Sequence, residues 1–196
     1  MAIKVLGIAG SPRRGGNTEI LLDRALEGAA SKGAETEKIV LSELQIAPCL
    51  NCDDCLLAGE CSIRDQMDLV YVKLREADRL ILASPIFFLS VSAQAKAMID
   101  RCQALWATKY ILHRPISLKK RRGLFIAVGH WKGEKNFSCA ITVVRAFFVT
   151  LDIKYEGNLL IGGIEKKGEI LKHPTACQEA FAAGARLAST DDSPGG

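Results

Sequence analysis

Four cysteines lie within a short stretch of this sequence, in the pattern Cys49-x-x-Cys52-x-x-Cys55-x-x-x-x-x-Cys61. Thiolates bind soft metals. Three of them at this spacing can bend around a cubane iron–sulfur cluster, which a fourth and more distant cysteine completes. Gly59 gives the chain freedom to turn before Cys61. The spacing therefore predicts a [4Fe–4S] cluster that these four cysteines hold.

Two other uses of the four thiols stay open. Zinc also takes four thiolates, although structural zinc sites usually split their ligands into two well-separated pairs. A redox or structural disulfide, such as one between Cys49 and Cys52, is the second alternative. The other three cysteines, Cys102, Cys139 and Cys177, fall in predicted helices among small apolar residues, and we expect them to be core residues.

A second candidate site lies near the start of the chain, in the loop Gly10-Ser-Pro-Arg-Arg-Gly-Gly-Asn-Thr18. The loop is neither a GxGxxG fingerprint nor a Walker A loop, because no Gly-Lys-Ser/Thr ends it. Its glycines can still turn backbone N–H groups inward beside a helix N-terminus, which favours a phosphate. A plain polar turn explains one glycine and one serine but not the whole set of donors. The candidate phosphate contacts are Ser11, Arg13, Gly16, Asn17 and Thr18.

Two further loops, at 84–91 and 129–136, also follow apolar runs. Flat apolar side chains there suit an aromatic ring system, and backbone N–H groups can bond its polar edge. Core packing under a loop is the alternative for Phe87 and Phe88. We expect His130 to be a loop contact. The candidate ring contacts are Pro85, Ile86, Phe87, Phe88, Leu89, Ser90, Gly129, His130 and Trp131.

Alternating strands and helices must position these loops. Apolar runs predict strands over 3–8, 36–41, 79–83, 123–128 and 154–161. Helical spacing predicts helices over 17–32, 66–77, 92–108, 137–151 and 175–188, the first capped by Asn17 or Thr18. This alternation calls for a parallel sheet with helices on both faces. Ligands bind beyond the carboxyl ends of such strands, where all three loops fall.

The composition is that of one globular domain, with 48% hydrophobic and 24% charged residues in 196. We expect the domain to span 1–188, with a cysteine-bearing loop at 42–65 and a disordered tail over 189–196. The net charge of +4 is scattered, which does not indicate nucleic acid. The densest basic run, 119–122, is expected to be a solvated turn. No apolar stretch is long enough to span a membrane and no signal peptide is recognisable, so a cytoplasmic location is expected.

Two of these stretches resemble the NADPH-dependent FMN reductase family. The loop 10–18 is similar to the family's phosphate loop, and residues 84–101 are similar to the stretch beside its isoalloxazine ring. The resemblance covers roughly residues 1–165. It implies FMN as cofactor and a flavodoxin-like α/β fold, a three-layer sandwich with a five-stranded parallel sheet of order 2-1-3-4-5. Phe87 stands where tyrosine is common and Leu89 where glycine is common, which bears on substrate choice more than on flavin binding.

The cysteine spacing resembles that of the iron–sulfur flavoproteins, a related branch that carries a [4Fe–4S] cluster. This implies an FMN-dependent oxidoreductase that relays electrons between FMN and the cluster. No catalytic side chain is expected, because the flavin carries the chemistry. The implied donor is NAD(P)H or a carrier such as ferredoxin, and the implied assembly is a homodimer or homotetramer.

Two alternatives to the relay remain. One is a cluster-free NAD(P)H-dependent FMN or quinone reductase. The other is a non-enzymatic flavodoxin-like electron carrier, although flavodoxins are typically acidic and this chain has a net charge of +4.

Overall fold

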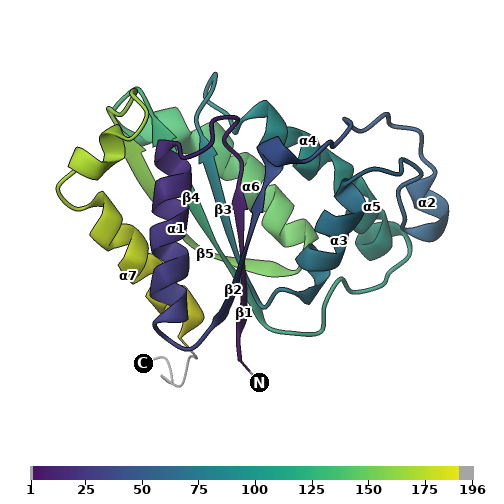
Figure 1. Cartoon of the computed structure of the whole chain (residues 1–196). Coiled ribbons are helices and arrows are strands. Elements are labelled where there is room, and N and C mark those ends of the chain that lie inside the picture. The colour runs from purple at the N-terminus through teal and green to yellow at the C-terminus, as the bar shows by residue number, and fades with distance from the viewer. Residues whose placement is uncertain (1, 190–196) are drawn as a thin grey trace.

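One parallel five-stranded sheet forms the centre of the computed structural model, which describes residues 2–189 (Figure 1). The strand order is β2-β1-β3-β4-β5, and every neighbouring pair is parallel. The predicted fold class and strand order are therefore confirmed. The strands are β1 (Lys4–Ala9), β2 (Glu35–Val40), β3 (Arg79–Pro85), β4 (Arg121–Gly129) and β5 (Ile153–Gly162).

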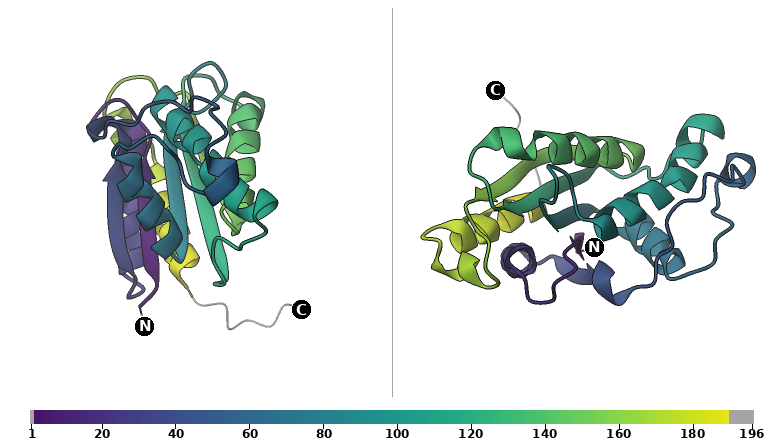
Figure 2. Two further views of the ribbon diagram at one scale, coloured as in Figure 1. Left: turned by 90° about the vertical axis from the view of Figure 1, so that its right-hand side faces the viewer. Right: turned by 90° about the horizontal axis from the view of Figure 1, so that it is seen from above.

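Helices cover both faces of the sheet (Figures 1 and 2). One face packs against α1 (Asn17–Ala30) and α7 (Ala176–Ala188). The other packs against α3 (Met67–Glu76), α4 (Ala93–Arg101), α5 (Gln103–Trp106) and α6 (Ser138–Thr150). The short elements are α2 (Cys55–Ala58), η1 (Leu41–Glu43), η2 (Ala107–Ile111), η3 (Glu134–Phe137) and η4 (Glu169–Lys172).

The central strands are apolar on both sides because both sides are covered. In β3, Leu80 and Leu82 belong to the core under α3–α6, whereas Ile81 and Ala83 belong to the core under α1 and α7. This alternation follows from the two-residue period of a strand. The edge strand β2 is instead exposed over its first half. Because all five strands are parallel, the loops that follow them lie at the same rim of the sheet.

The helix predicted over 92–108 is divided, which corrects that prediction. The first segment, α4, ends at Arg101, and α5 is followed by the π-helical turn η2. The side chain of Thr108 in this turn donates hydrogen bonds to the carbonyl oxygens of Gly59 and Ala104 at 3.1 and 2.9 Å. The divided helix therefore packs against the cysteine loop, through the contact between Thr108 and Gly59. Helical periodicity does not reveal this contact.

The basic run 119–122 also differs from the prediction of a solvated turn. Arg121 is buried within β4 and donates hydrogen bonds to the carbonyl oxygens of Leu74, Ala77 and Leu151. These carbonyls lie at the ends of α3 and α6, where a cation offsets the negative end of the helix dipole. Arg121 is therefore an internal brace between β4 and two helices.

One of the predicted core cysteines lies outside the core. Cys102 is buried and Cys177 is partly buried against the core under α1 and α7, but Cys139 is exposed. Cys139 belongs to α6, of which only one face is covered. Across residues 2–189, no helix has the length and apolar character needed to cross a membrane. Except for Ser189, the tail predicted to be disordered falls outside the described residues.

Candidate functional site

The three predicted loops meet at the carboxyl ends of β1, β3 and β4. Residues from all three line one cavity of about 310 Å³. Most of the predicted cofactor contacts lie on its wall, namely Ser11, Arg13, Gly16, Asn17, Thr18, Pro85, Ile86, Phe87, Gly129 and His130. The structure thus brings together three loops, of which the first and the last are more than a hundred residues apart in the chain.

A second, apolar cavity of about 240 Å³ adjoins the first. It shares Ile86, Phe87, Gly129 and His130 with the first cavity and adds Phe88, Leu89 and Trp131. A cavity with hydroxyl, amide and guanidinium groups on its wall, beside an apolar cavity, suits a ligand with a charged group at one end and a flat ring at the other. Ser90, the remaining predicted contact, lines neither cavity.

The loop 10–18 holds its shape through its own hydrogen bonds. The Ser11 hydroxyl accepts from the N–H of Arg13 at 3.0 Å and donates to the Arg13 carbonyl oxygen at 3.2 Å. A Cβ atom at Gly16 would lie 2.9 Å from that same carbonyl oxygen, so any side chain there would open the loop. The loop is therefore arranged before any ligand arrives.

Several donors of this loop remain available to an anion. The N–H groups of Asn17 and Thr18 open α1 and have no intrahelical partner. Within residues 2–189, the Thr18 hydroxyl has no hydrogen-bond partner and the Arg13 guanidinium has no ion pair. Together with the positive end of the helix dipole, these groups make an anion site.

Asn17 differs from its prediction in two respects. The residue that precedes α1 is Gly16, so neither Asn17 nor Thr18 caps the helix. The Asn17 side chain donates to the Lys166 carbonyl oxygen at 2.9 Å and accepts from the N–H of Ile170 at 3.3 Å. Its amide therefore ties α1 to the segment after β5, and its backbone N–H is what it offers to the cavity.

Glu19 is a structural part of this site that the sequence analysis missed. Its carboxylate is buried and accepts from the N–H of Gly15 at 2.8 Å, and it pairs with Arg14 and Lys38. Burial alone would raise the pKa of Glu19, but the Gly15 N–H and Lys38 bring it below the ordinary value. The sequence did contain a signal for this role of Glu19, because a glutamate at the third position of a helix occupies the capping-box position.

The loop 84–91 ends in a strained two-residue turn. Phe87 and Ser90 exchange two backbone hydrogen bonds of 3.0 Å, and between them Phe88 and Leu89 have φ angles of 48° and 64°. Two positive φ angles define a type I′ turn, which normally uses glycine or asparagine. Phe87 is 49% exposed and Phe88 is fully exposed, so these aromatic rings are not core residues.

Ser92, also missed from the sequence, links the two loops. Its hydroxyl caps α4 by accepting from the N–H of Ala95 at 3.1 Å, and it donates to the carbonyl oxygen of Gly10. The Ser92 N–H donates to the Ser84 hydroxyl at 2.9 Å. A buried serine thus fixes the ring loop relative to the start of the phosphate loop.

The segment after β5 adds two wall residues that were not predicted, Ile164 and Glu165. The N–H groups of Gly163 and Ile164 donate to the carbonyl oxygens of His130 and Gly129. The Glu165 carboxylate lies 3.5 Å from Nδ1 of His130, and both side chains are exposed. These two residues could have been predicted, because their loop follows the carboxyl end of the fifth strand, where ligands of parallel sheets bind.

The four clustered cysteines lie around a single small cavity, together with Arg101. Asn51 and Asp53 have φ angles of 52° and 63°, which curl the chain between successive cysteines. All seven cysteines of the chain are free thiols. Burial raises the pKa of Cys55, and the other three clustered thiols raise it further. The four cysteines therefore line one cavity.

Hydrogen bonds and close packing shape this loop. The N–H of Asn51 donates to Sγ of Cys49 at 3.5 Å, and Sγ of Cys52 lies 3.4 Å from the Ser62 hydroxyl. Gly59 ends α2 with a φ of 77°, and a Cβ there would lie 2.4 Å from the Thr108 hydroxyl. Four thiols with N–H and O–H donors nearby match an iron–sulfur site in kind. As placed, however, no group of three His, Cys, Asp or Glu side chains in the described residues could hold a metal ion.

Helix α4 runs from the first site to the second. Ser92, which caps it, belongs to the ring loop, and Arg101, which ends it, lines the cysteine cavity. Nine helical residues span about 13 Å at 1.5 Å per residue. The two candidate sites are therefore neighbours that share one rigid element.

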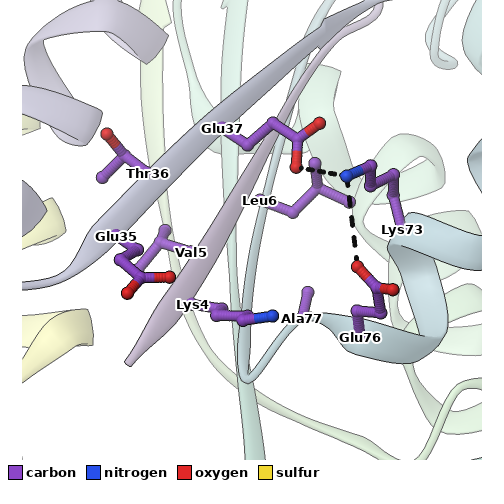
Figure 3. Close-up of a pocket in the computed structure, with 9 residues that line it drawn as sticks. All are labelled: Lys4, Val5, Leu6, Glu35, Thr36, Glu37, Lys73, Glu76 and Ala77. Carbon is purple, nitrogen blue, oxygen red and sulfur yellow. Dashed lines mark ion pairs between the residues drawn. The ribbon is translucent and has the colours of Figure 1, made fainter. Parts of the chain in front are cut away.

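A third groove lies at the amino ends of β1 and β2 and carries mainly charged side chains (Figure 3). Lys73 pairs with Glu37 at 3.0 Å and with Glu76 at 4.0 Å across it. Ligands of parallel α/β sheets bind at the opposite rim. Charged side chains on an edge strand are a common protection against strand pairing, and the groove is explained in that way.

Comparison with known proteins links the chain to flavin reductases. A family model described as NADPH-dependent FMN reductase matches residues 3–151. An iron-sulfur flavoprotein of Methanocaldococcus jannaschii is 46% identical over 103 residues, which is 53% of each chain. A second iron-sulfur flavoprotein of that organism is 37% identical over 150 residues, 75% of this chain and 71% of the relative. One from Methanosarcina thermophila is 38% identical over 127 residues, 65% of this chain and 63% of the relative. The chain thus spans about half to two thirds of most of these relatives.

Solved structures share the fold. A flavone reductase has a TM-score of 0.73 at 23% identity, covering 95% of this chain and 62% of that one. An NAD(P)H:quinone oxidoreductase from Methanothermobacter marburgensis has a TM-score of 0.73 at 14% identity, covering 95% and 100%. At such identities the likeness concerns the fold alone.

Proposed function

The chain belongs to the NADPH-dependent FMN reductase family, and we propose from that premise that it is an FMN-dependent oxidoreductase with FMN in the two adjoining cavities. The observation that carries this proposal is the junction of an anion site with an apolar cavity at the carboxyl ends of the strands. The ligand chemistry of FMN, a phosphate joined to a flat ring system, matches that junction. Residues 1–188 would form one domain for it.

The phosphate would be held by the first turn of α1 and the loop before it. The N–H groups of Asn17 and Thr18, the Thr18 hydroxyl and the Arg13 guanidinium supply the donors, and Ser11 and Gly16 keep the loop open. Charge-assisted hydrogen bonds of this kind are stronger than neutral ones. The loop therefore supplies much of the affinity.

The ring would lie against the loops 84–91 and 129–136. Phe87, Leu89 and Trp131 offer apolar surface, and the backbone of Pro85 and Ile86 with that of Gly129 and His130 borders the ring edge. FMN, when bound, supplies hydride acceptance and the release of single electrons. The residues of this chain bind and orient the ring and leave one side accessible through the exposed Phe88 turn.

The cysteine loop would hold a [4Fe–4S] cluster through Cys49, Cys52, Cys55 and Cys61 and exchange single electrons with the flavin. Support comes from the convergence of the four thiols on one cavity and from the relatives named iron-sulfur flavoproteins. NAD(P)H or a ferredoxin-like carrier is the proposed donor, and a homodimer or homotetramer is the proposed assembly. Zinc at the same thiols is distinguished by metal and sulfide analysis.

A cluster-free NAD(P)H-dependent reductase is the second candidate. The two cavities proposed for FMN support this candidate as much as they support the iron–sulfur flavoprotein. Rapid bleaching of bound FMN by NADPH, in a protein without iron, would establish it. A protein that holds FMN but turns over no donor would instead be an electron carrier.

Titration of the apoprotein with FMN tests the binding site. Thr18→Val removes the one hydroxyl of the anion site that has no partner in residues 2–189 and keeps the side-chain shape. Loss of one hydrogen bond to a charged group weakens FMN binding by roughly tenfold to a hundredfold. The matched control is Thr36→Val on the exposed edge strand, which leaves the affinity unchanged. Equal affinities for both variants would place FMN elsewhere.

A further inference from the structure

Arg101 is a buried arginine at the end of α4, with only 1% of its surface exposed. Its Nη1 donates to the carbonyl oxygen of Ala47 at 2.9 Å and to the Asp65 carboxylate at 2.7 Å. Its Nη2 donates to the carbonyl oxygen of Ile63 at 3.0 Å. Ala47 precedes the four clustered cysteines and Ile63 follows them, so one guanidinium joins the two ends of the cysteine loop.

The same side chain retains an unused donor, and Arg101 is one of the residues that line the cysteine cavity. Within residues 2–189, Nε of Arg101 is buried and has no hydrogen-bond partner. Arg101 lines the cavity together with the four cysteines. An arginine guanidinium stays protonated in proteins, so Arg101 carries a permanent positive charge on the lining of this cavity.

Bracing of the loop ends accounts for the Nη donors of Arg101 but leaves Nε unused in the described part of the chain. A buried N–H without a partner costs about 1–3 kcal/mol. Asp65 balances the guanidinium, but it also accepts from the N–H groups of Ala47 and Met67, on the loop ends. The positive charge of Arg101 therefore lies on the lining of the same cavity as the four cysteines.

We propose that Arg101 is a positioning residue for the centre held by Cys49, Cys52, Cys55 and Cys61, and that its charge raises the reduction potential of that centre. This inference rests on the proposed [4Fe–4S] cluster. Reduction adds one negative charge to a cluster, and a fixed cation nearby makes that addition more favourable. Hydrogen bonds to cluster sulfurs act in the same direction. Asp65, as the opposite charge behind Arg101, lowers the potential.

The test is a redox titration of the full chain, reconstituted anaerobically and followed by its visible and electron paramagnetic resonance spectra. Arg101→Gln shifts the cluster potential to lower values, and Asp65→Asn shifts it to higher values. The matched control is Arg64→Gln, because Arg64 is close to Cys61 in sequence but its side chain is 68% exposed. The control leaves the cluster potential unchanged. The potential of FMN in the same molecules stays constant and serves as the internal reference.

Iron release to a chelator reports the positioning role. Removal of a group that orients metal ligands typically weakens metal retention by at least tenfold, and we expect that change for Arg101→Gln but not for Arg64→Gln. If the Arg101→Gln variant does not hold a cluster, the Arg101→Lys variant, which keeps the positive charge, is titrated in its place. If neither Arg101 variant holds a cluster, the direction in which Asp65→Asn shifts the cluster potential decides whether the inference stands.

Opposite shifts for Arg101 and Asp65 support the inference. An unchanged potential in Arg101→Gln, or shifts of the same sign in both variants, would overturn it. Wild-type protein that binds no iron and sulfide after reconstitution would overturn the proposed cluster itself, before any variant is compared. The two failures are therefore distinguishable.

Discussion

Leu89 and Phe88 are residues in a backbone conformation that their side chains rarely adopt. Both have positive φ angles and both line the apolar cavity. Each such residue costs about 1–3 kcal/mol. The loop keeps this turn because its ends are fixed, at Ser84 and at Ser92. Strain on the wall of a cavity indicates that the turn is shaped for what it contacts.

The replacement Leu89→Gly tests that strain. Glycine adopts positive φ without penalty, so we expect Leu89→Gly to be more stable than Leu89→Ala by about 1 kcal/mol. Leu89→Ala is the matched control, because it removes the same side chain and keeps the penalty. Urea unfolding monitored by circular dichroism measures the difference. If Leu89→Gly is the less stable of the two, the turn is not strained.

Groups whose chemistry is local can be identified from the sequence, whereas hydrogen-bond partners far along the chain cannot. The spacing of the cysteines and the donors of the loop 10–18 could be read directly, and the structure places both groups on cavities. The Asn17 amide was expected to be a donor for the phosphate, and in the structure it donates to the carbonyl oxygen of Lys166, far along the chain. Arg121 was assigned to solvent, but three helix-end carbonyls bind it. Neither partner is visible before the fold is known.

Elements were predicted most accurately where burial is uniform. All five strands were found, because strands covered on both faces are continuously apolar. The prediction of one continuous helix over 92–108 was wrong. Helix α4 ends at Arg101, whose side chain donates a hydrogen bond to the carbonyl oxygen of Ala47, just before the cysteine loop. Helical periodicity records which face is buried, not where a second segment docks.

Helix α1 and its preceding loop form an element whose stability depends on pH. The pKa of Glu19 is lowered in the folded state, so its contribution is complete above the ordinary glutamate pKa of about 4.3 and is lost as the pH falls through the folded value. We expect Glu19→Gln to be about 1–3 kcal/mol less stable than wild type at pH 7.

The difference between the two proteins should shrink below pH 4. Urea unfolding of both proteins at pH 7 and pH 3.5 provides the measurement. Glu27→Gln is a suitable control, because Glu27 lies on the same helix and its side chain is 52% exposed. A difference that stays constant across this pH range would show that Glu19 does not act through its charge.

On the scale of the whole molecule, one helix connects two candidate redox sites. The candidate cofactor cavity lies at the carboxyl ends of β1, β3 and β4, and the cysteine cavity lies at the far end of α4. The ribbon views show α4 between the loops at this rim of the sheet and the cysteine-bearing segment (Figures 1 and 2). Because α4 packs in the core, the separation of the two sites is fixed by the fold. The architecture is therefore suited to passing electrons between two centres, and the central claim is that both centres are present.

The decisive measurement for this pair of centres is the content of FMN, iron and acid-labile sulfide in anaerobically prepared protein. We expect one FMN with about four irons and four sulfides per chain. Cys52→Ser should lose the iron and sulfide and keep FMN, whereas Cys139→Ser, an exposed cysteine outside the loop, should keep all three. Protein that binds FMN but holds zinc or no metal at the four thiols would show that the cluster is absent, and protein that binds no FMN would show that the flavin centre is absent.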